Sequence, residues 1–218
     1  MNRKIGIFSS LINIGAVIGF ALCMPLKFNF GSYFFSMFIA LSFIPMMWAY
    51  AYYSENKYKL AGYISAGFAS MYATIILLVY FAQLTTVRLD SLTPQAAALL
   101  DFQRFGLLFN YDLLGYALMA LSTFFAGLTI RANLRADKWL KYLLMIHGVF
   151  FISCLIVPML GLFRAGGAGD PSWMGMAVLE FWCGYFIPVG ILSYLHFVKC
   201  EEEIYGFGQT DTQPYLRK

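Results

Sequence analysis

Asp112, His147 and Glu180 are ionisable residues that lie within long apolar stretches of the sequence. A titratable side chain in the hydrocarbon region of a membrane needs a partner, a water-filled cavity or a ligand, because an isolated charge there is strongly destabilised. These residues are therefore the first candidates for chemistry. Two carboxyl groups that share a site would attract a cation or an amine, or would exchange a proton with one side of the membrane.

Each carboxyl group also has an interpretation in which it only supports the fold. Asp112 could form an ion pair with Arg88 or Arg104, because arginine side chains are long enough to extend along an apolar surface. Glu180 could be neutral and hydrogen-bonded to a tyrosine or to a backbone carbonyl. The residue types alone do not separate these interpretations from a binding site.

The chain that carries these residues is far more apolar than a soluble domain. Hydrophobic residues make up 61% of its 218 residues and charged residues only 12%, whereas about 25% charged residues is usual in soluble domains. Six apolar stretches are long enough to cross a membrane as helices, which takes about 20 residues each. The sequence therefore predicts an all-α polytopic membrane protein, a six-transmembrane-helix bundle with spans at about 5–26, 31–53, 60–86, 107–130, 139–163 and 174–198.

The charges of the connecting segments predict how this bundle is oriented. Of the 15 lysine and arginine residues, 11 fall on one side of the predicted membrane and 4 on the other. Basic residues favour the cytoplasmic side, so both termini are predicted to be cytoplasmic, which also requires an even number of spans. The larger group is Arg3, Lys4, Lys57, Lys59, Arg131, Arg135, Lys138, Lys141, Lys199, Arg217 and Lys218, and the smaller group is Lys27, Arg88, Arg104 and Arg164.

Depth along the predicted helices groups the polar residues. With a rise of about 1.5 Å per residue, Asp112 and Glu180 lie about 9 Å and about 10 Å below the outer ends of their helices. Gln83 is near the outer end of the third span, with Tyr80 just beneath it. We therefore predict an outer ligand-binding layer of Asp112, Glu180 and Gln83, with Tyr80 and Tyr116 as its aromatic walls.

His147 lies deeper, about 15 Å from this layer along the helix axes. Asn13 has a similar depth in the first span and is the predicted partner of His147, so both are interpreted as structural polar residues. The third span carries small residues that repeat every four positions, at Ser65, Ala69 and Ala73. Small side chains allow close helix packing in membranes, so we expect this helix to be central in the bundle.

Two segments lie outside the spans. Residues 91–105 are predicted to form a short outer helix, with Thr93 as its N-cap and Pro94 at the first helical position. This helix is interpreted either as a lid over the bundle or, more simply, as a connection without a gating role. Residues 1–200 are the membrane domain and residues 201–218 a polar cytoplasmic tail, and Cys200 at their junction is either an ordinary free thiol or a site of acylation.

Several function classes find no support in the sequence. It contains no Walker A loop, no dinucleotide-binding glycine fingerprint and no HExxH motif. Two histidines at different depths and dispersed cysteines predict neither a haem nor a zinc site, so no cofactor and no metal are expected. A hard cation held by the two acids and carbonyl oxygens is a weaker alternative. The basic residues are explained by membrane orientation, and no nucleic-acid partner is expected.

The leading hypothesis is a small membrane transporter or ligand-binding protein with an outward-facing polar cavity for a cationic or protonated small molecule. One alternative is an integral membrane enzyme that uses the acids on a lipid or another apolar substrate. Another is a non-catalytic subunit or regulator of a membrane complex. The size and pattern are similar to those of small bacterial membrane proteins, so the expected location is the bacterial cytoplasmic membrane. Beyond the lipid bilayer and such a ligand, no partner or oligomeric state is predicted.

Overall fold

The computed structural model describes residues 1–162 and 172–207 of the chain. Within these residues every regular element is a helix, and no strand occurs. The six apolar stretches predicted from the sequence form helical segments long and apolar enough to cross a membrane, and their ends differ from the predicted limits by a few residues. These segments are Asn2–Cys23, Asn29–Tyr53, Asn56–Val87, Leu107–Thr129, Arg135–Met159 and Gly175–Cys200.

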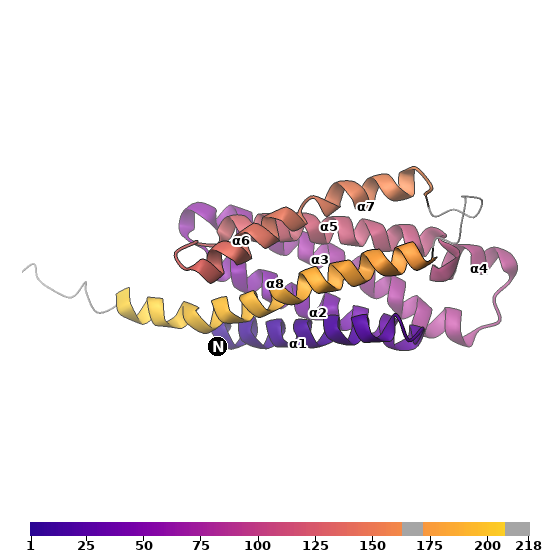
Figure 1. Ribbon diagram of the computed structural model, residues 1–218, viewed down its shortest axis with the longest axis horizontal. Coiled ribbons are helices and arrows are strands. Elements are labelled where there is room, and N and C mark those ends of the chain that lie inside the picture. Colours follow the sequence, from indigo (N-terminus) through magenta and orange to yellow (C-terminus); the bar gives the residue numbers. More distant parts are fainter. Residues whose placement is uncertain (163–171, 208–218) are drawn as a thin grey trace, which may run out of the picture.

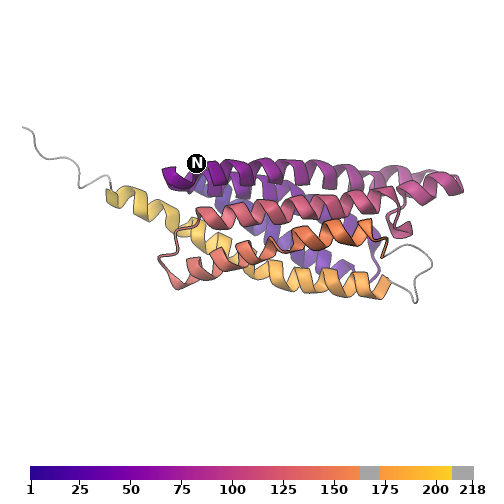
Figure 2. The same cartoon turned by 90° about the horizontal axis from the view of Figure 1, so that it is seen from above.

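The long helices run side by side along the longest axis of the molecule (Figures 1 and 2). They are α1 (Asn2–Cys23), α2 (Asn29–Tyr53), α3 (Lys59–Ala82), α5 (Leu107–Thr129), α6 (Arg135–His147), α7 (Phe150–Met159) and α8 (Ser172–Phe207). The shorter elements between them are η1 (Asn56–Tyr58), a π-helical turn η2 (Gln83–Val87), α4 (Pro94–Leu100) and η3 (Phe102–Arg104). α1 begins at the end of the bundle at which α8 finishes, and α4 lies at the opposite end (Figure 1).

Small residues join α3 to α5. The stripe predicted in the third span is fully buried along its length, at Ser65, Ala69 and Ala73. Ser65 and Ser122 of α5 exchange two hydrogen bonds of 2.8 Å, in which each hydroxyl donates to the backbone carbonyl of the other residue. Only small side chains allow two helix backbones to approach so closely. α5 is nevertheless more enclosed than α3, because the other face of α3 exposes large residues such as Met71 and Leu78.

The fifth span is interrupted directly after His147, where the sequence predicted one continuous helix. The backbone N–H groups of Gly148 and Val149 donate to carbonyls three residues earlier, at 3.1 and 3.0 Å, so the chain tightens into a 3₁₀ turn between α6 and α7. A Cβ atom on Gly148 would lie 2.9 Å from the Cβ of Phe124 in α5. The missing side chain therefore lets the fifth span approach α5 closely beside His147.

Gly148→Ala is expected to lower the free energy of unfolding by about 1–3 kcal/mol, because the added methyl group overpacks the contact with Phe124. Gly67→Ala in α3 is the matched control, since no atom lies within 4 Å of the position that its Cβ would take. This control should equal or slightly exceed the wild-type stability, because alanine favours a helix more than glycine does. Unfolding of both purified variants in detergent measures the difference, and equal losses would contradict the packing argument.

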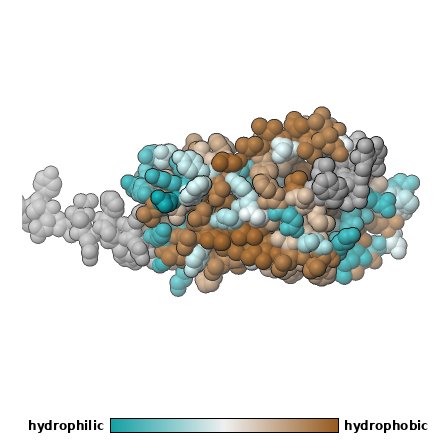
Figure 3. Space-filling model, viewed as in Figure 1, coloured by the Kyte–Doolittle hydropathy of each residue, from teal (hydrophilic) through white to brown (hydrophobic). Residues whose placement is uncertain are grey.

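The surface of the bundle is apolar along its length and polar towards its ends (Figure 3). We call the end at which α1 begins the basic end, because the lysine and arginine residues in the first turns of α1, α3 and α6 lie there. There Glu55 pairs with both Arg131, at 3.4 Å, and Lys57, at 3.2 Å. The α2–α3 and α5–α6 connections therefore meet at the basic end. We call the opposite end the α4 end.

The segment at the α4 end begins as the sequence predicted. The Thr93 side chain accepts a hydrogen bond of 3.3 Å from the backbone N–H of Ala96, and Pro94 occupies the first position of α4. Gly106 precedes α5, and a Cβ atom there would lie only 2.0 Å from the carbonyl oxygen of Ala98. Glycine is therefore required at this position, and the close contact packs α4 against the start of α5.

Candidate functional site

Asp112 is buried in α5, with 4% of its surface exposed. Its carboxyl group interacts electrostatically with the Tyr80 hydroxyl from α3. The oxygen Oδ1 of the same carboxyl group is buried and has no hydrogen-bond partner in the part of the chain that the structure describes. Because nearly all buried polar atoms in proteins are hydrogen-bonded, this unpaired oxygen marks a place for a proton, a water molecule or a ligand.

Three tyrosines surround this carboxyl group, and we call them the tyrosine cage: Tyr72, Tyr80 and Tyr116. All three are buried and interact electrostatically with Asp112. The rings of Tyr72 and Tyr116 lie 5.9 Å apart, and their hydroxyl groups have no hydrogen-bond partner among the described residues. Trp182 of α8 meets the Tyr116 ring edge to face at 5.6 Å. Aromatic faces attract cations, so the cage complements a positive charge beside Asp112.

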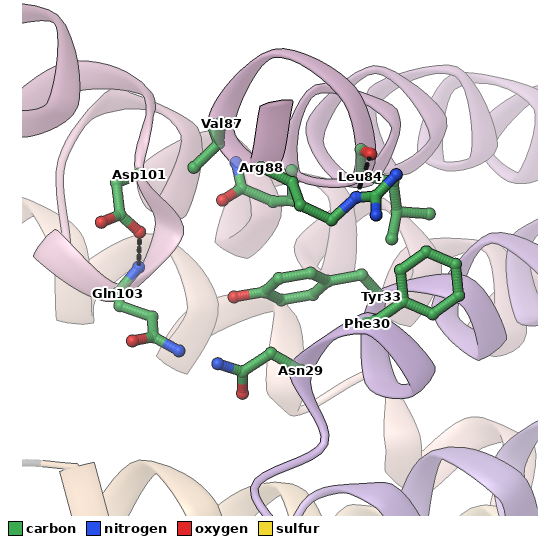
Figure 4. A pocket seen from close by; sticks show the side chains of 9 residues that line it. Asn29, Phe30, Tyr33, Leu84, Val87, Arg88, Asp101 and Gln103 are labelled. Carbon is green, nitrogen blue, oxygen red and sulfur yellow. Dashed lines mark hydrogen bonds between the residues drawn. The ribbon is translucent and has the colours of Figure 1, made fainter. Parts of the chain in front are cut away.

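An open hollow of about 220 Å³ lies at the α4 end, next to the cage (Figure 4). Tyr33 of α2 crosses it and points its hydroxyl towards the Gln103 side of the hollow. The Tyr33 ring also stacks on that of Tyr80, at 5.5 Å between centroids. Tyr33 and Tyr80 therefore connect the hollow to Asp112. The hollow is lined by Asn29, Phe30, Tyr33, Gln83, Leu84, Val87, Arg88, Asp101 and Gln103.

Gln83 fastens the segment that borders this hollow. Its Nε2 donates to the carbonyl of Leu100 at 2.7 Å, and its Oε1 accepts from the backbone N–H of Phe102 at 3.0 Å. The Phe102 ring then contacts the rings of Tyr33 and Tyr80, at 5.9 and 5.8 Å. Both ends of the Gln83 amide are therefore bound to the backbone and position Phe102, and the role of Gln83 as a ligand-binding residue stays a prediction. Gln83 begins the π-helical turn η2, and such turns are frequent at functional sites.

Gln83→Ala is expected to release the α4–η3 segment. Each lost hydrogen bond contributes about 1 kcal/mol, so the backbone amide of Phe102 should exchange with deuterium several-fold faster than in the wild-type protein. Gln83→Glu is the matched variant, since it keeps an acceptor for Phe102 but loses the donor to Leu100, and its exchange rate should fall between the two. Hydrogen–deuterium exchange followed by mass spectrometry measures the rates. An unchanged exchange rate of the Phe102 amide in Gln83→Ala would show that the Gln83 side chain does not hold the α4–η3 segment in place.

The structure does not bring Glu180 to Asp112, although their predicted depths are similar. Glu180 precedes Trp182 by two residues in α8, and two residues turn a helix by about 200°. Trp182 is therefore the residue of this pair that meets Tyr116, and Asp112 and Glu180 do not contribute to each other's electrostatic surroundings. Over residues 1–162 and 172–207 no hydrogen bond or ion pair joins the two acids, and Oε1 of Glu180 is itself buried without a partner there.

The predicted ion pairs of Asp112 are not formed. Arg104 lies 3.6 Å from the carboxylate of Asp101. Arg88 donates to a backbone carbonyl one turn earlier at 3.0 Å, and its guanidinium lies 5.2 Å from the centroid of the Phe30 ring. The prediction that either arginine neutralises Asp112 is therefore wrong. Both arginines have their partners at the α4 end of the bundle.

His147 is fully hydrogen-bonded beneath the cage. Its Nε2 accepts from the indole N–H of Trp182 at 3.0 Å, and its Nδ1 lies 2.8 Å from the Thr123 hydroxyl. An indole can only donate, so Nε2 carries no proton, and Nδ1–H is the donor to Thr123. The Thr123 hydroxyl donates in turn to a backbone carbonyl three residues earlier, at 2.9 Å. This network joins α5, α6 and α8 around a neutral imidazole.

Asn13 does not reach His147, so the predicted pair between them is wrong. The Asn13 amide donates to the carbonyl of Ile39 at 3.2 Å and to the hydroxyl of Ser42 at 3.0 Å. Both partners belong to α2. Asn13 therefore fastens α1 to α2 and has no contact with the fifth span through its amide nitrogen.

Neither a search for metal-binding clusters nor comparison with known proteins assigns a ligand or an activity to this site. Among the described residues, no group of three or more His, Cys, Asp or Glu side chains could hold a metal ion. No protein-family model, curated protein or solved structure matches the chain. Its function therefore rests on the chemistry of the site itself.

Sequence reasoning missed three residues that shape the site: Tyr33, Tyr72 and Phe102. A signal for Tyr72 was present, because Tyr72, Ile76 and Tyr80 repeat every four residues and so share one face of α3. Tyr33 and Phe102 come from other elements. Only the packing of α2 and η3 against α3 brings their rings to Tyr80, and no local pattern reports that contact.

Proposed function

We propose that this chain is a multi-pass membrane protein that binds a small organic cation, such as a protonated amine, at Asp112 and moves it across the membrane. The proposal rests on Oδ1 of Asp112, which has no hydrogen-bond partner among the described residues. Asp112 is only 4% exposed and lies inside the tyrosine cage. A bound cation would neutralise this acid. Each aromatic face would add about 0.5–2 kcal/mol of cation–π attraction.

The hollow at the α4 end supports an entry route for this cation. Tyr33 and Tyr80 lead from the hollow to Asp112, and Phe102 borders both rings. Displacing the Phe102 ring would open the short path between them. The division of 11 basic residues against 4 supports cytoplasmic termini, and the hollow then faces the outside of the cell.

The two other function classes explain the site less well. An enzyme that uses two acids needs the second carboxyl group beside Asp112, but no hydrogen bond or ion pair joins Glu180 to Asp112 among the described residues, and both nitrogens of His147 are engaged by Trp182 and Thr123. A purely structural role gives no reason for a buried carboxyl oxygen and two buried tyrosine hydroxyls without partners. A small organic cation would pair with this carboxyl oxygen and lie against the aromatic rings of the cage.

The proposal is tested with methylammonium, tetramethylammonium and choline as probes. At a concentration one hundred times its Kd, a bound probe should stabilise the purified full chain in detergent by about 2.7 kcal/mol. Dimethylbutanol, the uncharged isostere of choline, is the matched control and should give no stabilisation. Radiolabelled methylammonium should then accumulate in proteoliposomes and not in protein-free vesicles. Equal effects of choline and its isostere, or no effect of any cation, would overturn the proposal.

A further inference from the structure

A second cluster of reactive side chains lies at the basic end of the bundle, far from the tyrosine cage. His196 of α8 is 3.0 Å from the carboxylate of Asp137 in α6, measured from Nδ1 to Oδ1. Cys200 follows one helical turn after His196, on the same face of α8. The Cys200 thiol and the His196 imidazole interact electrostatically. A thiol, an imidazole and a carboxylate thus follow one another in space.

The hydrogen bond to Asp137 fixes the role of each nitrogen of His196. A carboxylate can only accept, so Nδ1 carries the proton that Asp137 receives, and the other ring nitrogen is left to accept a proton from the thiol. The ring of Tyr50 packs on the imidazole at 5.6 Å, and that of Phe197 at 5.5 Å. The base is therefore oriented by a carboxylate and held by aromatic rings, which is the arrangement that activates a nucleophile.

We propose that Cys200 is an acyl-accepting nucleophile that takes a long-chain acyl group from an acyl thioester. His196 removes the thiol proton as the Cys200 sulfur attacks the thioester carbonyl. The tetrahedral intermediate then collapses, the bond from the acyl carbon to the carrier sulfur breaks, and His196 returns the proton to the departing thiol. The products are S-acyl Cys200 and the free carrier thiol, so no oxidant or further reactant is needed.

The surroundings of Cys200 favour a donor with an apolar chain and an anionic carrier. Lys138 and Lys141 follow Asp137 in α6, and Lys199 precedes Cys200 in α8. Lysine side chains bind phosphate groups, which the carriers of acyl thioesters contain. The α8 helix also exposes apolar side chains one and two turns before Lys199, at Leu195 and Ile191. An acyl chain could lie along this strip within the lipid.

The N-terminus of α1 is fastened beside the same cluster. Arg3 donates from Nη2 to the carbonyl of Val198 at 2.9 Å, two residues before Cys200. This contact holds α1 against α8 near the cluster. The site therefore combines three helices, and it is independent of the cation site proposed at Asp112.

The test incubates the purified full chain with palmitoyl-CoA that carries an alkyne reporter. Hydroxylamine-sensitive label should map to Cys200 by mass spectrometry, vanish in Cys200→Ala and persist in the matched variant Cys154→Ala. His196→Asn retains a donor to Asp137 but loses the base, so its labelling rate should fall by about 10²–10⁴-fold while its unfolding in detergent stays unchanged. Asp137→Asn, which keeps an acceptor for His196, should give a smaller fall.

Two results would overturn the proposal. One is label spread evenly over Cys23, Cys154, Cys183 and Cys200, which is the outcome of uncatalysed chemistry. The other is a wild-type labelling rate in His196→Asn. Vesicles of dipalmitoyl phosphatidylcholine form a further arm, and acyl transfer from this oxygen ester in place of palmitoyl-CoA would contradict the thioester assignment. Failure of cation binding at Asp112 would leave every one of these results unaffected.

Discussion

Asp112→Asn is expected to abolish the stabilisation of the protein by choline and tetramethylammonium while leaving its fold intact. Asparagine has the size of aspartate and keeps an oxygen that can accept from the Tyr80 hydroxyl. It has no charge to attract the cation, so the stabilisation of about 2.7 kcal/mol at one hundred times Kd should fall to zero. Methylammonium uptake should fall with it.

Glu180→Gln is the matched control for this variant, since it also removes one acid near the same depth. Because no hydrogen bond or ion pair joins Glu180 to Asp112, Glu180→Gln should bind and take up the probes as the wild-type protein does. Thermal unfolding in detergent at several probe concentrations measures both variants. Retained stabilisation in Asp112→Asn, or an equal loss in Glu180→Gln, would place the cation somewhere other than the cage.

His147→Leu is expected to give the largest loss of stability, about 2–5 kcal/mol, because it leaves the indole N–H of Trp182 buried without an acceptor and removes the partner of Thr123. Adding Trp182→Phe to the His147→Leu variant removes the indole N–H that has lost its acceptor. The double variant should therefore be less destabilised than the sum of the single variants, with a coupling energy of about 0.5–3 kcal/mol.

Chemical or thermal unfolding of the four proteins in the same detergent completes this double-mutant cycle. Thr123→Val extends the cycle, since it removes only the hydroxyl that accepts from Nδ1 of His147. Additive losses in the double variant would show that the hydrogen bond between His147 and Trp182 contributes nothing beyond packing. A choline response that survives in His147→Leu would agree with a structural role for this histidine, separate from the cation site.

The spans and local helix signals were accessible from the sequence, because they depend on neighbouring residues. An apolar stretch of about 20 residues is sufficient to indicate a span, and all six stretches form helices long and apolar enough to cross a membrane. Thr93 and Pro94 begin α4 because capping and proline geometry act within one turn. The four-residue repeat that includes Ser65 likewise predicted a tightly packed face, which the contact with Ser122 confirms.

The candidate site could be predicted only in part from the sequence. Counting residues gives the depth of a side chain along its helix, but not the direction in which the side chain points. Counting residues along α5 and α8 gave similar depths for Asp112 and Glu180, but the way each helix is rotated is set by its neighbours. The same limit applies to Gln83, since the π-helical turn that directs its amide to Phe102 has no recognised sequence signal. Asp112 was identified because a buried acid in an apolar helix is conspicuous whatever its partners are.

The interruption after His147 also divides the fifth span energetically. In α6 the side chains of Leu140, Leu144 and His147 are buried, whereas no residue of α7 is buried. Regions with few buried contacts open at lower free energy than the core to which they are attached. We therefore expect α6 to unfold together with α5 and α8, and α7 to open at a lower free energy than α6.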